Sequence, residues 1–439
     1  MNGTQRTRTL PYLAFLLAFV LLVGRGYFGF QTQDEGCFIA AVHRFSCGFL
    51  PFIDEWGIQQ GAAWLVTPLY SLYLQLAGSA TSVLLIARMT MAVLALAVCT
   101  VTFRMLRPTY GPVLSCCLCL SLPLSLLSLS PSPGDALGIL FLSLTFILGW
   151  NTWQLAAHDS NQPGVARVAC PLLCGAFAVL SVISCGILAL AAAIILAVLC
   201  PLALLRCGGR PSVAAPWIAC GVLVAAACYA CLTFIASDPG QIAANAANLH
   251  FFEAGISIST ALFLVVAAVL SACAFLGREG RFAKQAPVLG GIVAIVLLAC
   301  GLSSLISCRL APTTQLEEGP ASGISVSSEE AAAYNGILEL AAIANTGDVV
   351  AFTQDSSWAA TAVTGNLNQP SAWCGRFTSE DVTAYYEKRL YPEWVLVPAS
   401  SADSSAASDA LGALGTYGVF KSNDFGTLYK RASKLSYIN

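Results

Sequence analysis

The sequence predicts an α-helical polytopic membrane protein of about nine spans plus interfacial helices, with a small C-terminal extracytoplasmic α/β domain. Of the 439 residues, 57% are hydrophobic and only 10% are charged, against about 25% charged in a typical soluble domain. Apolar windows recur at the ~20-residue length that crosses ~30 Å of hydrocarbon. After residue 309 the composition becomes that of a water-soluble chain. The nine windows are residues 10–29, 82–103, 112–130, 134–153, 167–184, 186–205, 214–236, 257–276 and 286–307.

The distribution of basic residues sets the orientation of these spans. Lys and Arg collect in cytoplasmic loops, so Arg6 and Arg8 place the N-terminus in the cytoplasm. A further apolar stretch, 61–78, carries Trp, Tyr, Pro and Gln and suits the membrane interface better than the bilayer core. If it does not span, the first loop (30–81) and everything after 308 lie outside. Later basic residues then fall inside: Arg104, Arg107, Arg167, Arg206, Arg210, Arg278, Arg281 and Lys284. We therefore expect a multi-pass protein of the plasma membrane.

The chain divides into a transmembrane domain (1–309) with its first outer loop, a linker (310–326) and an extracytoplasmic α/β domain (327–439). In the last domain, runs with strand and helix periods alternate, which is typical of one small α/β core. No Gly-rich nucleotide-binding sequence occurs in it. Its expected helices are 327–345, "SEDVTAYYEKRL" and "SDALGALG", and its expected strands are "DVVAFTQ", "EWVLVPAS", "YGVFKS" and "GTLYKRA".

Composition excludes several classes of function. The net charge of −2 and the lack of a run of Lys or Arg exclude a nucleic-acid-binding surface. Most of the 18 cysteines lie inside apolar runs and act as small hydrophobic residues. No CxxC pair with a matching cluster predicts a zinc site. Cys37 and Cys47 flank the expected loop helix, and a disulfide between them needs Cα atoms within ~7 Å, which a straight helix prevents.

The stretch "QTQDEGCFIAAVHRFSCGFLPFIDEWGIQQ" (31–60) concentrates charge at the edge of the bilayer. It holds four carboxylates, on Asp34, Glu35, Asp54 and Glu55. A general base works best when an apolar surround or a second acid raises its pKa, and adjacent acids at a membrane edge provide that setting. The pattern favours a site for an amphiphilic substrate, whose tail lies in lipid and whose reactive head lies at the interface.

Two arginines are candidates for binding a phosphate at this depth. Arg25 lies at the outer end of the first span, and Arg88 lies six residues into a span that begins at the outer face. Charge inside a span is by default a functional hypothesis, and a departing phosphate needs cations to take up its developing charge. His43, on the loop helix, is a further candidate for the same cavity.

Each candidate also has an ordinary structural explanation, and both explanations stay open. Asp34 and Glu35 suit the N-terminus of the helix that follows them. Asp54 and Glu55 suit a solvated turn. The arginines can extend toward lipid head groups, and a single exposed histidine is usually without a role. Asp135 follows Pro-Gly and suits the N-cap of the next span.

Several short motifs, in a particular order, resemble a known family. The motifs are "QDEG", "CFIAAVHRFSCG", "LPFIDEWG", "ARMTMAVLALAVCTVTFRML" and "SLSPSPGDALGILFLSLTFIL". Their order and spacing over residues 10–205 resemble the N-terminal half of the polytopic membrane glycosyltransferases of the C superfamily. The similarity is greatest to the protein O-mannosyltransferase and aminoarabinose-transferase branch.

The resemblance implies an inverting transfer of a sugar from a polyprenyl-phosphate donor on the outer face of the membrane. By match to "QDEG" it implies Asp34, with Glu35 beside it, as the catalytic carboxylate, and it gives Asp135 the place of the family's turn aspartate. The acceptor is a protein, a lipid or a cell-wall glycan. No cofactor is certain; a divalent cation, held by Asp34 and Glu35 in an oxygen shell, is one option.

The sequence also departs from the family pattern. Where the aminoarabinose branch has a basic residue and a Pro pair before the aromatic helix, this chain reads "WGIQQGAAWL", which puts in question how the phosphate or the acceptor is held there. Two other functions stay open: a transporter or flippase of lipid-linked intermediates, and a non-catalytic membrane scaffold with an outer binding domain. The first expects polar or broken helices at the midplane, and the second expects the tail to bind a partner.

Overall fold

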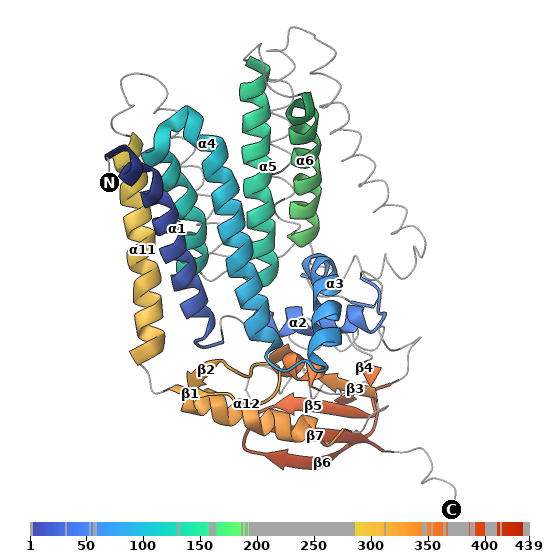
Figure 1. Ribbon diagram of the computed structural model, residues 1–439. Helices are drawn as coiled ribbons and strands as arrows, with labels where there is room; N and C mark the ends of the chain where they lie inside the picture. Colours follow the sequence, from blue (N-terminus) through green and yellow to red (C-terminus); the bar gives the residue numbers. More distant parts are fainter. Residues whose placement is uncertain are drawn as a thin grey trace, which may run out of the picture. The chain divides into compact units, whose positions relative to one another are not determined.

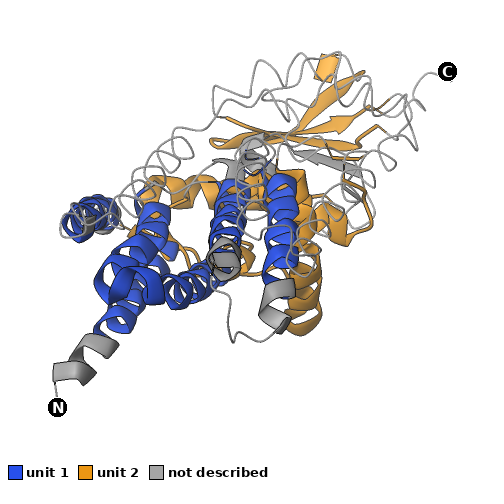
Figure 2. Ribbon diagram, turned by 90° about the horizontal axis from the view of Figure 1, so that it is seen from above, with its two compact units in different colours: residues 1–26, 88–238, 251–308 blue, residues 27–87, 239–250, 309–439 orange. Residues whose placement is uncertain are grey.

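The computed structural model describes most of the first half of the chain and much of its last third. The described residues are 3–30, 33–51, 54–55, 59–129, 132–157, 164–185, 188, 192, 286–310, 313–344, 349–352, 354–362, 366–367, 386, 391–399, 411–412 and 415–432. Their contacts divide the chain into two compact units, coloured separately in Figure 2. Unit 1 comprises residues 1–26, 88–238 and 251–308, and unit 2 comprises 27–87, 239–250 and 309–439. Each unit therefore joins segments that are far apart in the sequence.

Unit 1 is helical in its described part. Its helices are α1 (Gly3–Gly26), most of α4 (Val83–Leu129), α5 (Pro133–Ala157), α6 (Gly164–Ser184) and α11 (Ala286–Leu310). Within the described residues, three helical segments are long and apolar enough to cross a membrane, in α4, α5 and α11, and shorter apolar segments lie in α1 and α6. Fewer spans are thus shown than the nine expected. Three windows, 186–205, 214–236 and 257–276, fall almost wholly outside the described residues.

Helix α4 contains a sharp reversal at Gly111. The residue has φ 75° and ψ 171°, a conformation that glycine adopts without the Cβ clash of other residues. The Cys99 thiol donates to the Cys119 carbonyl across 3.3 Å, although twenty residues of continuous helix would separate them by about 30 Å. The two halves therefore fold back on each other (Figure 1), and each half matches one expected window.

Helices α5 and α6 pack closely through small residues and lie side by side in Figure 1. A Cβ built on Gly138 would lie 2.8 Å from the Cys185 Cβ, so only glycine allows this approach. The Ser181 hydroxyl donates to the Gly138 carbonyl at 2.9 Å, and the Cys174 thiol donates to the Thr145 carbonyl at 3.2 Å. Small side chains and interhelical hydrogen bonds are typical of helix contacts inside membranes.

Unit 2 combines the first loop with the C-terminal α/β region. The loop supplies α2 (Gln33–Ser46) and α3 (Gln60–Ala77), and α3 is not among the three helices that qualify as spans. The C-terminal region begins with a two-stranded sheet of β1 (Thr313–Gln315) and β2 (Ser325–Ser327). The sequence left that segment as a linker. Its remaining elements are α12 (Ser328–Ala341), β3 (Val349–Phe352), η2 (Gln354–Thr361), β4 (Asn366–Leu367), β5 (Trp394–Pro398), β6 (Tyr417–Asn423) and β7 (Gly426–Arg431).

Among the described residues, the larger sheet of unit 2 has five strands in the order β4-β3-β5-β7-β6. Strand β3 is parallel to β4 and β5, whereas β7 is antiparallel to β5 and β6. Helix α12 and strands β3, β5, β6 and β7 confirm the elements expected there, while β4 and η2 were not expected. The expected helices "SEDVTAYYEKRL" and "SDALGALG" lie almost entirely outside the described residues, apart from helical positions 386, 411 and 412.

One hydrophobic core joins the loop to the sheet. Helix α12 lies against the sheet (Figure 1) and contributes Ile337 and Leu340 to a buried cluster with Leu396 of β5 and Leu428 of β7. Ala40 of α2 belongs to the same cluster. The first loop is therefore packed as part of the α/β unit, although sequence analysis grouped it with the transmembrane domain.

Backbone hydrogen bonds fix both ends of the first loop to the β1–β2 hairpin. At its start, the amide of Gly29 donates to the Ser325 carbonyl at 2.8 Å, and the Ser325 amide donates to Tyr27 at 2.7 Å. At its end, the amides of Ser82 and Leu84 donate to the carbonyls of residues 319 and 320, each at 3.1 Å. The hairpin thus holds both ends of the first loop within unit 2.

Candidate functional site

The predicted catalytic acids lie in the first turn of α2. The helix begins at Gln33, so Asp34 and Glu35 occupy its second and third positions, where the helix dipole favours carboxylates. The side chain of Glu35 is 6% exposed. That of Asp34 lies outside the described side chains. Helix placement is thus compatible with both explanations, a base and a dipole-stabilised helix terminus.

Glu55 is the buried partner of an arginine that sequence analysis did not select. The Arg44 guanidinium lies 3.3 Å from the Glu55 carboxylate, and their side chains are 1% and 0% exposed. Arg44 also donates to the Asp54 carbonyl at 2.8 Å and stacks its guanidinium 4.8 Å from the Phe49 ring centroid. The expectation of a solvated turn at Glu55 is therefore wrong. This carboxylate is neutralised by an ion pair that closes the loop after α2.

Asp54 has a local role in the same turn. Its carboxylate accepts a hydrogen bond from the Leu50 amide at 2.9 Å, and its own amide donates to the Leu50 carbonyl at 2.9 Å. Such reciprocal bonds stabilise a tight turn. The structure thus accounts for Asp54 by turn geometry, which agrees with the structural explanation weighed from the sequence.

His43 links α2 to α3. Its Nδ1 lies 2.8 Å from the Tyr70 hydroxyl, and the two rings meet edge to face with centroids 5.8 Å apart. Burial lowers the pKa of His43 to about 4, so the imidazole is neutral at pH 7. Its Nε2 lies 4.0 Å from the Cys47 thiol. His43 is therefore a packed, hydrogen-bonded residue rather than an exposed one, and Cys47 and Cys37 form no disulfide.

Arg25 and Arg88 are both buried in unit 1, each with 8% of the side chain exposed. Arg88, near the start of α4, donates from Nη1 to the Gly26 carbonyl at the end of α1, at 2.8 Å. Gly26 leaves room for this approach, since a Cβ there would lie 3.5 Å from the Arg88 Cβ and 2.7 Å from the Met89 methyl. Cations at a helix C-terminus are electrostatically favoured. In the described fold neither guanidinium extends freely outward, as a side chain reaching for head groups would.

Asp135 is held by hydrogen bonds, but it is not the N-cap. The Ser132 hydroxyl accepts from the Asp135 amide at 3.3 Å, so Ser132 caps α5 and Pro133 takes the first helical position. The N-cap expectation for Asp135 is therefore wrong by one turn. Its carboxylate accepts from the Cys185 thiol at the end of α6, at 3.1 Å. The "S-P" pair before the aspartate was the sequence signal for this cap.

The candidates are divided between the two units. Arg88 of α4 contacts the end of α1, the helix that carries Arg25, and both belong to unit 1. Asp135 also belongs to unit 1, whereas the carboxylates of the first loop belong to unit 2. A single cavity that contains Asp34, Arg88 and Asp135 stays a prediction. Among the side chains that the structure describes, no three His, Cys, Asp or Glu residues form a metal-ligating group. A cation bound by Asp34 and Glu35 also stays a prediction.

No protein-family model, curated protein or solved structure matches this chain. The resemblance to membrane glycosyltransferases therefore rests on the motifs and their order.

Proposed function

We propose that the chain transfers a sugar from a polyprenyl-phosphate donor to an acceptor on the outer face of the membrane. Asp34, assisted by Glu35, is the base, and Arg25 and Arg88 bind the donor phosphate. The observation that carries the proposal is the burial of both arginines, one where α1 ends and one where α4 begins. In the sequence these two positions flank the acidic first loop. Membrane helices carry buried cations mainly where a substrate requires them.

The chemistry of the leaving group explains why two guanidiniums are needed. When the acceptor oxygen attacks the anomeric carbon, the bond from that carbon to the phosphate oxygen breaks and the phosphate gains negative charge. Fixed cations in a site of low dielectric stabilise this charge more than water does. The bond from Arg88 Nη1 to the Gly26 carbonyl fixes this guanidinium at the end of α1, so it needs no reorganisation as the charge develops.

The base requires a rigid support, and unit 2 provides one. The acceptor hydroxyl transfers its proton to a carboxylate of α2 as its oxygen attacks, and inversion follows from a single displacement. Ala40, one and a half turns after Glu35 on α2, packs in the core with Leu340 and Leu396. A base on a helix that is locked by packing keeps its geometry better than one on a loop.

The proposal is tested with the full-length protein in lipid nanodiscs and a panel of radiolabelled polyprenyl-phosphate hexoses and pentoses. Release of polyprenyl phosphate measures donor turnover with a membrane extract as the source of acceptor. We expect Asp34→Asn and Arg88→Ala each to lower turnover by about 10²–10³-fold, the usual cost of losing one preorganised stabilising group. Arg88→Lys keeps the charge without the planar fork and should retain part of the activity.

Arg104→Ala is the matched control, because Arg104 lies on the same helix with an exposed side chain. It should turn over the donor like the wild type. Turnover in Asp34→Asn and Arg88→Ala equal to that of Arg104→Ala contradicts the proposal. So does movement of the intact donor across vesicle bilayers without release of polyprenyl phosphate, which indicates a flippase.

A further inference from the structure

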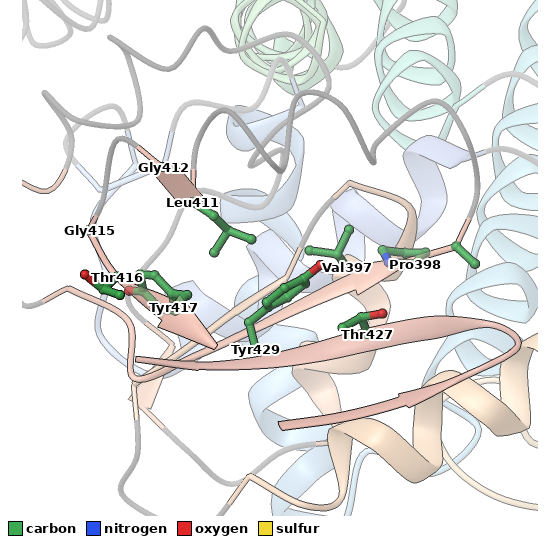
Figure 3. A pocket seen from close by; sticks show the side chains of 10 residues that line it. Val397, Pro398, Leu411, Gly412, Gly415, Thr416, Tyr417, Thr427 and Tyr429 are labelled. Atoms are coloured by element: carbon green, nitrogen blue, oxygen red, sulfur yellow. The ribbon is translucent and has the colours of Figure 1, made fainter. Parts of the chain in front are cut away.

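Unit 2 contains a hollow on the side of its sheet that faces away from the α12 core. Its volume is about 510 Å³, within the range of sites that hold small ligands. Leu396 and Leu428 point to the α12 core, so their neighbours Val397, Thr427 and Tyr429 point to the opposite face, because side chains alternate along a strand. Figure 3 shows these residues on one side of the hollow and Leu411 on the other.

The described lining of this hollow carries hydroxyl groups and no charge. Thr416, Tyr417, Thr427 and Tyr429 contribute hydroxyls, and the other lining residues are aliphatic, proline or glycine. Two of these hydroxyls are already engaged. Tyr417 donates to the Pro392 carbonyl at 2.6 Å, and Thr427 shares a hydrogen bond with Ser422 at 2.9 Å. Burial raises the pKa of Tyr417 to about 12, so its phenol stays neutral.

The other two hydroxyls are available to a ligand. Within the described part of the chain, neither the Tyr429 nor the Thr416 side chain makes a hydrogen bond. In Figure 3 the Tyr429 hydroxyl lies beside Val397 and Pro398, toward the interior of the hollow. A partly enclosed phenol beside apolar side chains gains from a partner that replaces its water.

The described part of the lining favours one class of ligand. Among those residues there is no Lys or Arg to balance a phosphate or carboxylate, and no Asp or Glu to balance a cation. A purely apolar ligand would leave the free hydroxyls without partners. A neutral sugar fits, since its hydroxyls donate to and accept from Tyr and Thr hydroxyls, while its C–H face packs on the aliphatic and aromatic walls.

We propose that this hollow binds an uncharged sugar residue of a glycan. The inference that a sugar binds is drawn from the lining residues alone. The inference that this sugar is part of the acceptor rests on the proposed function. On that basis unit 2 both supports the catalytic acids and retains a neutral glycan near the outer membrane surface.

The test is saturation-transfer NMR on the full-length protein in nanodiscs, with the neutral probes methyl α-mannoside, methyl β-glucoside and methyl α-galactoside. Glucuronate and glucosamine serve as charged probes of similar size. We expect saturable binding of at least one neutral glycoside at millimolar concentration and weaker binding of both charged sugars. Tyr429→Phe should weaken binding about 5–10-fold, the worth of one hydrogen bond, and Thr416→Val should add to that loss.

Tyr12→Phe, an exposed tyrosine of α1, is the control and should bind like the wild type. The proposal is overturned by equal affinity of Tyr429→Phe and wild type, by preference for a charged sugar, or by binding of none of the five probes. Arg88→Ala separates the two proposals: it should lose donor turnover and keep glycoside binding. A protein that turns over the donor without binding any glycoside overturns the sugar site alone.

Discussion

In unit 1 helix α11 turns large aliphatic side chains outward, whereas in unit 2 helix α12 turns its own onto a sheet. Ile292, Ile295 and Val296 of α11 are more than half exposed, while Ile337 and Leu340 of α12 are buried. Such an exposed surface drives association in water, but against lipid tails, which are as apolar as leucine, it is neutral. The contrast indicates that α11 suits a lipid surround, whereas α12 is packed like a helix of a water-soluble domain.

The proposed reaction draws on both kinds of environment. The acids of the first loop stand on α2, which is packed in the core of unit 2, and the arginines belong to the helices of unit 1. Although the first loop is adjacent in sequence to the spans, its geometry depends on residues after 309. Mutations in the two units should therefore differ in what they destabilise, and this difference can be measured.

The largest effect is expected at the buried ion pair of unit 2. Arg44→Ala leaves the Glu55 carboxylate buried without its guanidinium and should lower the free energy of unfolding of unit 2 by about 3–5 kcal/mol. Native-state hydrogen exchange of α2 and of residues 47–55, in nanodiscs, measures the loss. The double variant Arg44→Met with Glu55→Leu removes both charges and should recover most of it.

An exposed ion pair in the same unit provides the control. Lys421 and Glu339 lie 2.7 Å apart with side chains 44% and 62% exposed, and Lys421→Ala should cost about 0–1 kcal/mol. If Arg44→Ala costs no more than Lys421→Ala, the Arg44 pair is solvated and unit 2 lacks the dry interior described above.

The next effect compares leucines in the two units. Leu340→Ala opens a cavity in the core of unit 2, where Leu340 is fully buried, and should cost about 2–5 kcal/mol. Leu289→Ala in α11 removes a side chain that is 48% exposed and should leave the stability of unit 1 in lipid almost unchanged. Exchange rates of α2 should rise in Leu340→Ala as well, because Ala40 shares that core. Equal costs at the two leucines would contradict the assignment of different surroundings to α11 and α12.

Local patterns predicted the α-helices that the structure describes and four of its seven described strands, since each depends on the period and composition of a short run. Those patterns could not predict that α2 joins the hydrophobic core of α12, η2 and the sheet, since these segments are remote from α2 in sequence. The Arg44–Glu55 pair was missed for a related reason, as the two residues face each other across an irregular loop rather than at helical spacing. The cap at Ser132 was readable from its Ser-Pro pair, whereas Asp135 was a candidate because it matches the family's turn aspartate.

The third effect is a pH dependence that arises from His43 in unit 2. The pKa of the His43 imidazole is about 4 in the folded protein and 6.5 in the unfolded chain. Below pH 6.5 the unfolded state therefore binds a proton at His43 more readily than the folded state does. The contribution of neutral His43 to the free energy of unfolding is fully present above that pH. It is lost as the pH falls toward 4, and the loss is on the order of 2–3 kcal/mol. His43 is the single histidine among the described residues, so the described helices of unit 1 should not follow this dependence.

His43→Gln isolates this contribution. Carboxylates that titrate in the same window act equally in both proteins, so the difference between them over pH 4–6.5 reports His43. Thermal unfolding in buffered nanodiscs across that window is the measurement. An unchanged slope in His43→Gln would mean that the imidazole is hydrated and that α2 and α3 do not exclude water around it.

The smallest effect concerns the start of α12, where a capping box joins the β1–β2 hairpin to the core. The Ser327 hydroxyl accepts from the Glu330 amide at 3.2 Å, and the Ser327 amide donates to the Glu330 carboxylate at 2.9 Å. Ser327→Ala should cost about 1 kcal/mol, and Ser327→Asp should restore most of it. Ser307→Ala in α11 removes a hydroxyl that bonds only to its own helix, at the Ser304 carbonyl, and should cost less.

Because the cap adjoins Ser325, which holds the start of the first loop, exchange at Gly29 should rise in Ser327→Ala and not in Ser307→Ala. Equal exchange at Gly29 in both variants would show that the hairpin holds the loop independently of α12.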